Sequence, residues 1–179
     1  MHRTVRGAVA AVVVAGVVLG AVSSAEAKPK KQSTAKYAKT VCVTYSMLLD
    51  EFTTYANGIS GLDSTDAAGF ASQATTQTNA FLAKVKAAEK TLQGAYPDIS
   101  NGKKVGTLLA TNATEIDKAI SSALSQLQSG GVAGPATFVA ALRTLGTRIS
   151  DPFSKVTDQG LINAFQKEKT CKTVVHVIG

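Results

Sequence analysis

The sequence predicts an all-α fold, an antiparallel up-and-down four-helix bundle closed by one disulfide and preceded by a cleaved signal peptide. Three observations predict it. From Ala35 onward, apolar residues recur at alternating steps of three and four, which places them on one face of a helix. Short linkers rich in Gly, Pro and Ser divide this pattern into four segments, and such linkers favour antiparallel neighbours. The only two cysteines stand near the start of the first segment and after the last.

Residues 1–27 have the three parts of a secretory signal peptide: a basic start, an uncharged apolar run and small residues at Ala25 and Ala27. We therefore expect cleavage after Ala27 and a secreted or cell-wall-associated protein. The alternative is an uncleaved N-terminal membrane anchor, because residues 7–25 are just long enough to span a bilayer. The Ala, Val and Gly content of this run and the Ala-x-Ala site that ends it favour cleavage.

The first two predicted helices have clear stripes and ends. The first is expected to stop at Asn57-Gly58, a sequence suited to a left-handed cap. Its stripe consists of Ala38, Val41, Tyr45, Leu48, Phe52 and Tyr55. The second is expected to begin after a capping residue within 64–66 and to end at Gly94. Its stripe consists of Ala67, Ala71, Ala74, Thr78, Phe81, Val85, Ala88 and Leu92.

The third and fourth helices follow the same pattern. The third should be capped near Ser100 or Asn101 and end before Ser129-Gly130-Gly131. Its stripe consists of Val105, Leu109, Asn112, Ile116, Ala119, Ala123 and Leu127. The fourth should start at Pro135, which suits a first helical turn, and stop before Pro152. Its stripe consists of Phe138, Leu142, Leu145 and Ile149. Asn112 is a polar residue on an apolar stripe, and its usual role is to select helix register.

The last part of the chain has a weaker pattern. Apolar residues between Phe153 and Phe165 predict one or two further helical turns, which Gly160 is expected to interrupt. Only residues 174–178 alternate in the way that a strand would.

Cys42 and Cys171 are expected to form a disulfide. An exported protein folds in an oxidising compartment, where paired cysteines oxidise. A zinc site needs three or four ligands, and no histidine lies near either cysteine. In an up-and-down bundle the start of the first helix and the end of the last share one pole, so the bridge fits the predicted topology.

The positive charge is expected to reside in a short arm. The chain has a net charge of +7, yet residues 40–179 contain 12 basic and 11 acidic residues. We therefore divide the chain into a signal peptide (1–27), a basic flexible arm (28–39) and a helical domain (40–179). The lysines of the arm are Lys28, Lys30, Lys31, Lys36 and Lys39. They are expected to contact an anionic envelope polymer or lipid headgroups, and the alternative is a solvated spacer.

Enzymatic and cofactor-binding functions lack the residues they need. Di-metal helical proteins use Glu-x-x-His pairs, and no glutamate here has a histidine three residues on. A serine triad needs a base, and after residue 27 only His176 is present, within an apolar tail. We expect no enzyme activity, metal or cofactor. Nucleic-acid binding is not expected either, because the basic segment has no interleaved stacking aromatics.

Several segments resemble small exported helical proteins of actinobacteria, most of which are uncharacterised. The resemblance rests on the signal peptide ending "SSAEA", the early "KTVCVTY", the Ala/Thr-rich helices and the late "AFQKEKTC". It covers the layout of the chain, implies an envelope or extracellular location and transfers no active residue. The expected function is non-enzymatic binding at the cell surface, with the protein partner unspecified. The alternative is a carrier that holds a small apolar ligand between its helices, although the alanines of the second stripe leave little room for one.

Overall fold

The computed structural model describes residues 28–130, 134–150 and 153–174. The predicted signal peptide, His176 and most of the strand-like segment 174–178 lie outside the described residues. The elements in chain order are β1 (Lys30–Gln32), α1 (Thr34–Ser60), α2 (Ala67–Gln93), β2 (Ala95–Pro97), α3 (Gly102–Ser129), α4 (Gly134–Ser150), α5 (Gln159–Lys167) and the 3-10 helix η2 (Lys169–Thr173). The predicted all-α class is confirmed.

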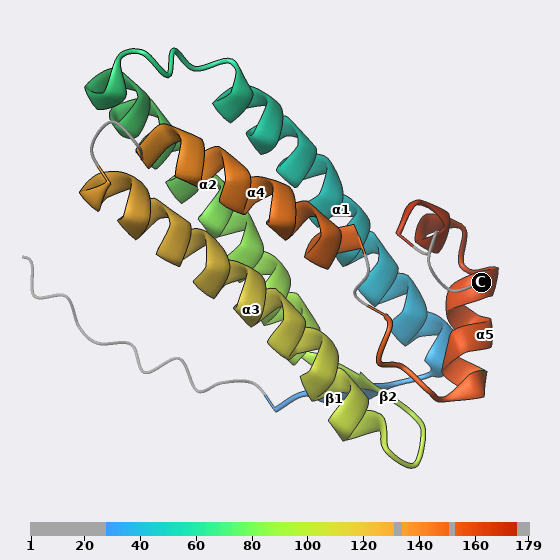
Figure 1. Cartoon of the computed structure of the whole chain (residues 1–179). Helices are drawn as coiled ribbons and strands as arrows, with labels where there is room; N and C mark the ends of the chain where they lie inside the picture. The colour runs from blue at the N-terminus through green and yellow to red at the C-terminus, as the bar shows by residue number, and fades with distance from the viewer. Residues whose placement is uncertain (1–27, 131–133, 151–152, 175–179) are drawn as a thin grey trace, which may run out of the picture.

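The four long helices lie side by side, and successive helices run in opposite directions (Figure 1). α1 packs on α2, α2 on α3 and α3 on α4, while the shorter α4 also contacts α1. α5 and η2 pack against α1 at the end of the domain that also carries β1 and β2. The turn between α1 and α2, the end of α3 and the start of α4 lie at the opposite end.

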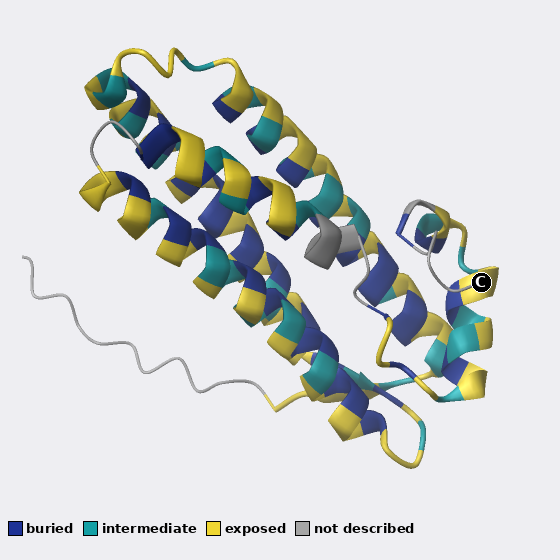
Figure 2. Cartoon of the chain, in the orientation of Figure 1, coloured by how far each residue is buried: buried dark blue, intermediate teal, exposed yellow. Residues whose placement is uncertain are grey.

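The buried residues follow the predicted stripes. Inward faces of the helices are buried and outward faces are exposed (Figure 2). All six residues predicted for the first stripe are buried, as are Phe81, Val85 and Leu109 on its neighbours. Near the end of α1 the ring of Tyr55 stacks on that of Phe81, with the ring centroids 4.8 Å apart. The periodicity missed Phe70, which is buried and meets the ring of Phe138 edge-on at 6.4 Å.

Most helix ends were predicted, but the expectations at Gly58 and Gly160 were wrong. Asp66 caps α2, since its side chain accepts a hydrogen bond from the Gly69 backbone at 2.9 Å. The predicted stop of the first helix at Asn57-Gly58 is wrong, because α1 continues to Ser60 and buries Ile59. The capping residue Gly61 has φ −85°, so no left-handed conformation is involved. Gly160 does not interrupt α5 but is its second residue.

A two-stranded parallel sheet was not predicted. Lys30, Lys31 and Gln32 of β1 pair with Ala95, Tyr96 and Pro97 of β2. β2 lies close against the start of α3, where two glycines permit the approach. A Cβ on Gly102 would overlap the Pro97 carbonyl oxygen, and one on Gly106 would lie 2.9 Å from Tyr96 Cβ. The sheet therefore fixes residues 30–32 to the connection between α2 and α3.

This sheet corrects the expectation of a flexible arm over residues 28–39. Residues 30–32 form β1, and α1 begins at Thr34 with Ser33 as its N-cap. Tyr37 and Ala38 are fully buried. α1 therefore includes the part of the predicted arm from Thr34 onward, because Tyr37 and Ala38 belong to its buried face.

None of the helices within the described ranges combines the length and apolar character needed to cross a membrane.

Candidate functional site

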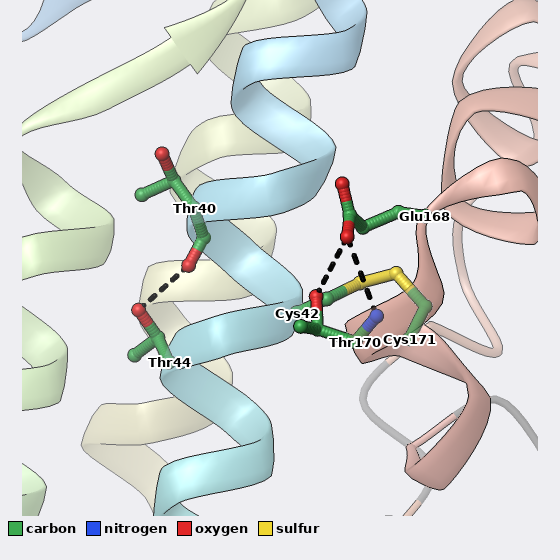
Figure 3. The surroundings of a disulfide bond; sticks show 6 residues. All are labelled: Thr40, Cys42, Thr44, Glu168, Thr170 and Cys171. Atoms are coloured by element: carbon green, nitrogen blue, oxygen red, sulfur yellow. Dashed lines mark hydrogen bonds between the residues drawn. A yellow bond between two sulfur atoms is a disulfide. The ribbon is translucent and has the colours of Figure 1, made fainter.

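The predicted disulfide is present. Cys42 on α1 and Cys171 on η2 are bonded, with their Cα atoms 4.8 Å apart and a separation of 129 positions in sequence. Both cysteines are buried. η2 is capped by Glu168, whose carboxylate accepts hydrogen bonds from the backbone and hydroxyl of Thr170 (Figure 3). The bridge fixes η2, and with it the end of α5, against the flank of α1.

The lysines predicted for the arm belong to an ordered surface. Lys30 and Lys31 lie on β1, while Lys36 and Lys39 lie on the first turns of α1. The Lys30 backbone donates to Gly94 at 2.9 Å, and Lys31 Nζ lies 2.6 Å from Asp98 Oδ1. This ion pair raises the pKa of Lys31. Lys28 precedes β1 directly.

Lysines from three separate stretches of sequence gather at this end of the domain. We name residues 28–39, 86–104 and 153–172 the lysine end. The folding topology brings them together, because the start of α1, the end of α2, the start of α3 and the α5–η2 segment share that end (Figure 1). Every lysine of the lysine end is exposed. They are Lys28, Lys30, Lys31, Lys36, Lys39, Lys86, Lys90, Lys103, Lys104, Lys155, Lys167, Lys169 and Lys172.

Few carboxylates balance these thirteen lysines. The lysine end contains four acidic residues, and three of them accept hydrogen bonds within the protein. Asp158 caps α5, Glu168 caps η2, and Glu89 accepts from Thr114 Oγ1 at 2.6 Å. The fourth, Asp98, pairs with Lys31. Among the described residues no other lysine of the lysine end forms an ion pair, so most of its charge is uncompensated.

The rest of the helical domain has the opposite balance. Six carboxylates lie on the parts of α1 and α3 beyond the lysine end and on the α1–α2 turn. They are Asp50, Glu51, Asp63, Asp66, Glu115 and Asp117. The exposed described cations there are Lys84, Lys118 and Arg143, and Lys84 pairs with Glu51 at 3.1 Å. A count over residues 40–179 is close to neutral only because two oppositely charged ends cancel.

The composition of the lysine end limits the chemistry it can perform. It contains lysine and no arginine. A lysine ammonium is a compact, hydrated point charge, whereas the arginine fork recognises one carboxylate or phosphate in fixed geometry. Its aromatic residues offer little stacking surface, since Tyr37, Phe153 and Phe165 are buried and Tyr96 is partly covered by Lys103, 5.8 Å from its ring centroid. The surface can attract anionic groups electrostatically, and its lysines impose no fixed geometry on them.

The described residues also show how the polar side chains of the core are used. Tyr45 donates from its hydroxyl to the Leu109 carbonyl at 2.9 Å, and its hydroxyl also bonds the side chain of half-buried Asn112. Tyr55 shares a 2.9 Å hydrogen bond with Thr78. This contact links Asn112 of α3 to α1, and the role of Asn112 in helix register stays a prediction. In the described parts of the chain, no three His, Cys, Asp or Glu residues cluster in a way that could hold a metal ion.

Burial of the tyrosine hydroxyls predicts loss of stability at alkaline pH. Burial raises the pKa of Tyr55 from 10 to about 12 and raises those of Tyr37 and Tyr45 further. Their contribution to stability is complete below pH 10 and is lost above it, because the unfolded chain then binds fewer protons. In that pH range each buried tyrosine should lower the free energy of unfolding by about 1.4 kcal/mol per pH unit.

A Tyr96→Phe variant keeps only the three buried tyrosines. Its tyrosinate absorbance should rise over the same pH range in which circular dichroism detects alkaline unfolding. The same variant in denaturant should ionise near the ordinary tyrosine pKa. Ionisation of the folded protein at that lower pH would show that the hydroxyls contact water.

The lysine end is thus built by the fold from segments that are distant in sequence. Comparison of the chain with protein-family models, with curated proteins and with solved structures found no match to any of them.

Proposed function

We propose that this protein is an exported, non-enzymatic binding protein that attaches to an anionic partner of the cell envelope through its lysine end. The observation that carries the proposal is the surplus of exposed, unpaired lysines on an ordered surface at one end of a domain whose other half is acidic. Such segregation produces a directed electrostatic field, which both attracts and orients an anionic partner.

The location and architecture are part of the same proposal. A buried disulfide supports folding in an oxidising compartment, as does the signal-like segment 1–27. We assign the helical domain to the up-and-down four-helix bundles, with α5 and η2 as additions. Alternating helix directions and one core shared by α1–α4 support this assignment.

The non-enzymatic character is supported by how the reactive side chains are used. Both cysteines are consumed in the bridge, and Tyr45 and Tyr55 take part in hydrogen bonds between helices. Aromatic rings also occupy the space between helices, where Tyr45 meets Phe153 at 5.8 Å. These contacts favour a function at the surface over carriage of a small apolar ligand inside the domain.

Sedimentation with isolated cell envelopes tests the proposal. A variant that loses three unpaired lysines of the lysine end, K30Q/K90Q/K104Q, should bind more weakly than the wild type at low salt. Each lysine near an anionic surface contributes about 1 kcal/mol, so the variant should lose about 3 kcal/mol. Binding of the wild type should fall as salt rises, because the Debye length shortens.

The matched control is K84Q/K118Q/R143Q, which removes the same charge outside the lysine end. It should bind as the wild type does. Equal binding by the wild type and both variants, unaffected by salt, would place the contact elsewhere on the protein. Substitutions are preferable to removal of residues 28–39, because that segment contains buried Tyr37 and Ala38.

A further inference from the structure

The shape of the lysine end narrows the class of its partner. Its lysines do not lie in one plane. One group surrounds the β1–β2 sheet, at the end of the domain, and includes Lys30, Lys90 and Lys104. The other lies on the flank formed by α5 and η2 and consists of Lys167, Lys169 and Lys172. We call these two groups the sheet group and the flank group.

The disulfide fixes how far along α1 the flank group lies. It joins η2 to Cys42, which lies more than two helical turns beyond the first residue of α1. At the rise of an α-helix this is about 12 Å along the helix axis. Electrostatic attraction in physiological salt decays over about 8 Å. A flat bilayer pressed against the sheet group would therefore attract the flank group only weakly.

Other side chains also argue against a bilayer. Among the described residues, the large hydrophobic side chains that are exposed are Val43 and Met47, and both lie on α1 outside the lysine end. Among the described residues around the sheet group, no aromatic or large aliphatic side chain is exposed and able to enter the headgroup region. A flexible chain can bend from the end of the domain onto its flank, so it can contact both groups. It also needs no apolar side chain for binding.

We propose that the lysine end takes a flexible, linear polyanion, which runs from the sheet group onto the flank group. This inference rests on the proposed function and specifies its partner. Lysines without arginine suit such a partner, because hydrated point charges interact with many closely spaced anionic groups in no fixed geometry. Both phosphodiester and carboxylate polymers have the required spacing of charge. The lack of exposed stacking rings favours a polymer without bases.

The test measures the affinity of the full-length mature protein for three probes across a salt series. The probes are long-chain inorganic polyphosphate, polyglutamate, and vesicles of phosphatidylglycerol mixed with phosphatidylcholine. The variants are K30Q/K90Q/K104Q for the sheet group, K167Q/K169Q/K172Q for the flank group, and the control K84Q/K118Q/R143Q. Thermal melting of each variant establishes that it is folded.

For polyphosphate, both group variants should lose affinity by about a hundredfold at low salt. Each should also reduce the salt slope by about 2, as expected for three contacts with a flexible polyanion. The control should stay within a few-fold of the wild type. For vesicles, one group variant should lose binding while the other behaves as the control does. The polyglutamate series separates the chemistries, since weaker binding than to polyphosphate at equal charge would assign phosphate groups.

Two outcomes would contradict a flexible polyanion as the partner without contradicting the proposed function. In one, a single group variant accounts for all polyphosphate binding. In the other, vesicles bind more tightly than polyphosphate and require both groups. If the control variant loses as much as the group variants, or if no probe binds the wild type, the proposed function itself fails.

Discussion

Replacing Phe81 with aspartate should unfold the protein or leave it barely stable. Phe81 is 3 % exposed and lies between two other rings, stacked on Tyr55 at 4.8 Å and 5.9 Å from Phe52. Truncating a buried phenylalanine costs about 3 to 5 kcal/mol. A carboxylate at the same place adds the cost of desolvating a charge or of protonating it. The sum approaches the whole stability of a typical domain, about 5 to 15 kcal/mol.

Circular dichroism during thermal melting measures this effect. Ala83→Asp is the matched control, because it introduces the same side chain two residues away on the exposed face of α2. It should change stability by less than about 1 kcal/mol. Phe81→Leu should lie between the two. If Phe81→Asp and Ala83→Asp melted at the same temperature, the core between α1 and α2 would be incorrectly placed.

The sequence could predict this part of the core because each long helix repeats its apolar residues many times. Tyr45, Phe81, Leu109 and Phe138 all fall on predicted stripes and are all buried. One kind of error occurred where the buried face of a helix is wider than one residue per turn. The other occurred where burial of an apolar residue outweighs a helix-stop sequence. Phe70 is of the first kind. Ile59 is of the second, since its burial extends α1 past the expected stop at Gly58.

The β1–β2 sheet could not be predicted from local pattern. Each strand has three residues, too few for an alternation to be visible, and the two are far apart in sequence. Its clearest signal is the pair of glycines at the start of α3, Gly102 and Gly106, which leave room for β2. Two glycines spaced by one turn of a helix indicate close contact, but they do not identify the partner.

The lysine end shows a different limit of prediction from sequence. Every charge in it is visible in the sequence, yet a net charge summed over residues 40–179 hides the separation into two ends. Assigning each charge to a pole of the predicted antiparallel helices would have grouped Lys36, Lys90 and Lys104 at one end. The position of the α5–η2 lysines follows from the Cys42–Cys171 bridge. The information was present, but it required topology as well as composition.

Removing the disulfide should be the other large loss of stability. The bridge closes a loop of 129 residues, and the chain-entropy estimate for such a loop is about 5 kcal/mol. Measured losses for native disulfides run from about 2 to 5 kcal/mol, so a Cys42→Ala/Cys171→Ala variant should melt roughly 10 °C lower. Thiol titration of denatured, unreduced wild-type protein should find no reactive thiol.

Wild-type protein in reductant is the control that separates the bridge from the packing of its sulfur atoms. It lacks the bond but keeps both thiols, so a similar melting temperature for the reduced protein and the double variant assigns the loss to the bond. Hydrogen exchange should rise most in α5 and η2, because the remaining contacts that hold them are the apolar ones of residues such as Leu161 and Phe165. If reduction left both the melting temperature and the exchange of η2 unchanged, packing alone would hold this segment. The flank group would then keep its place beside α1 without the bridge.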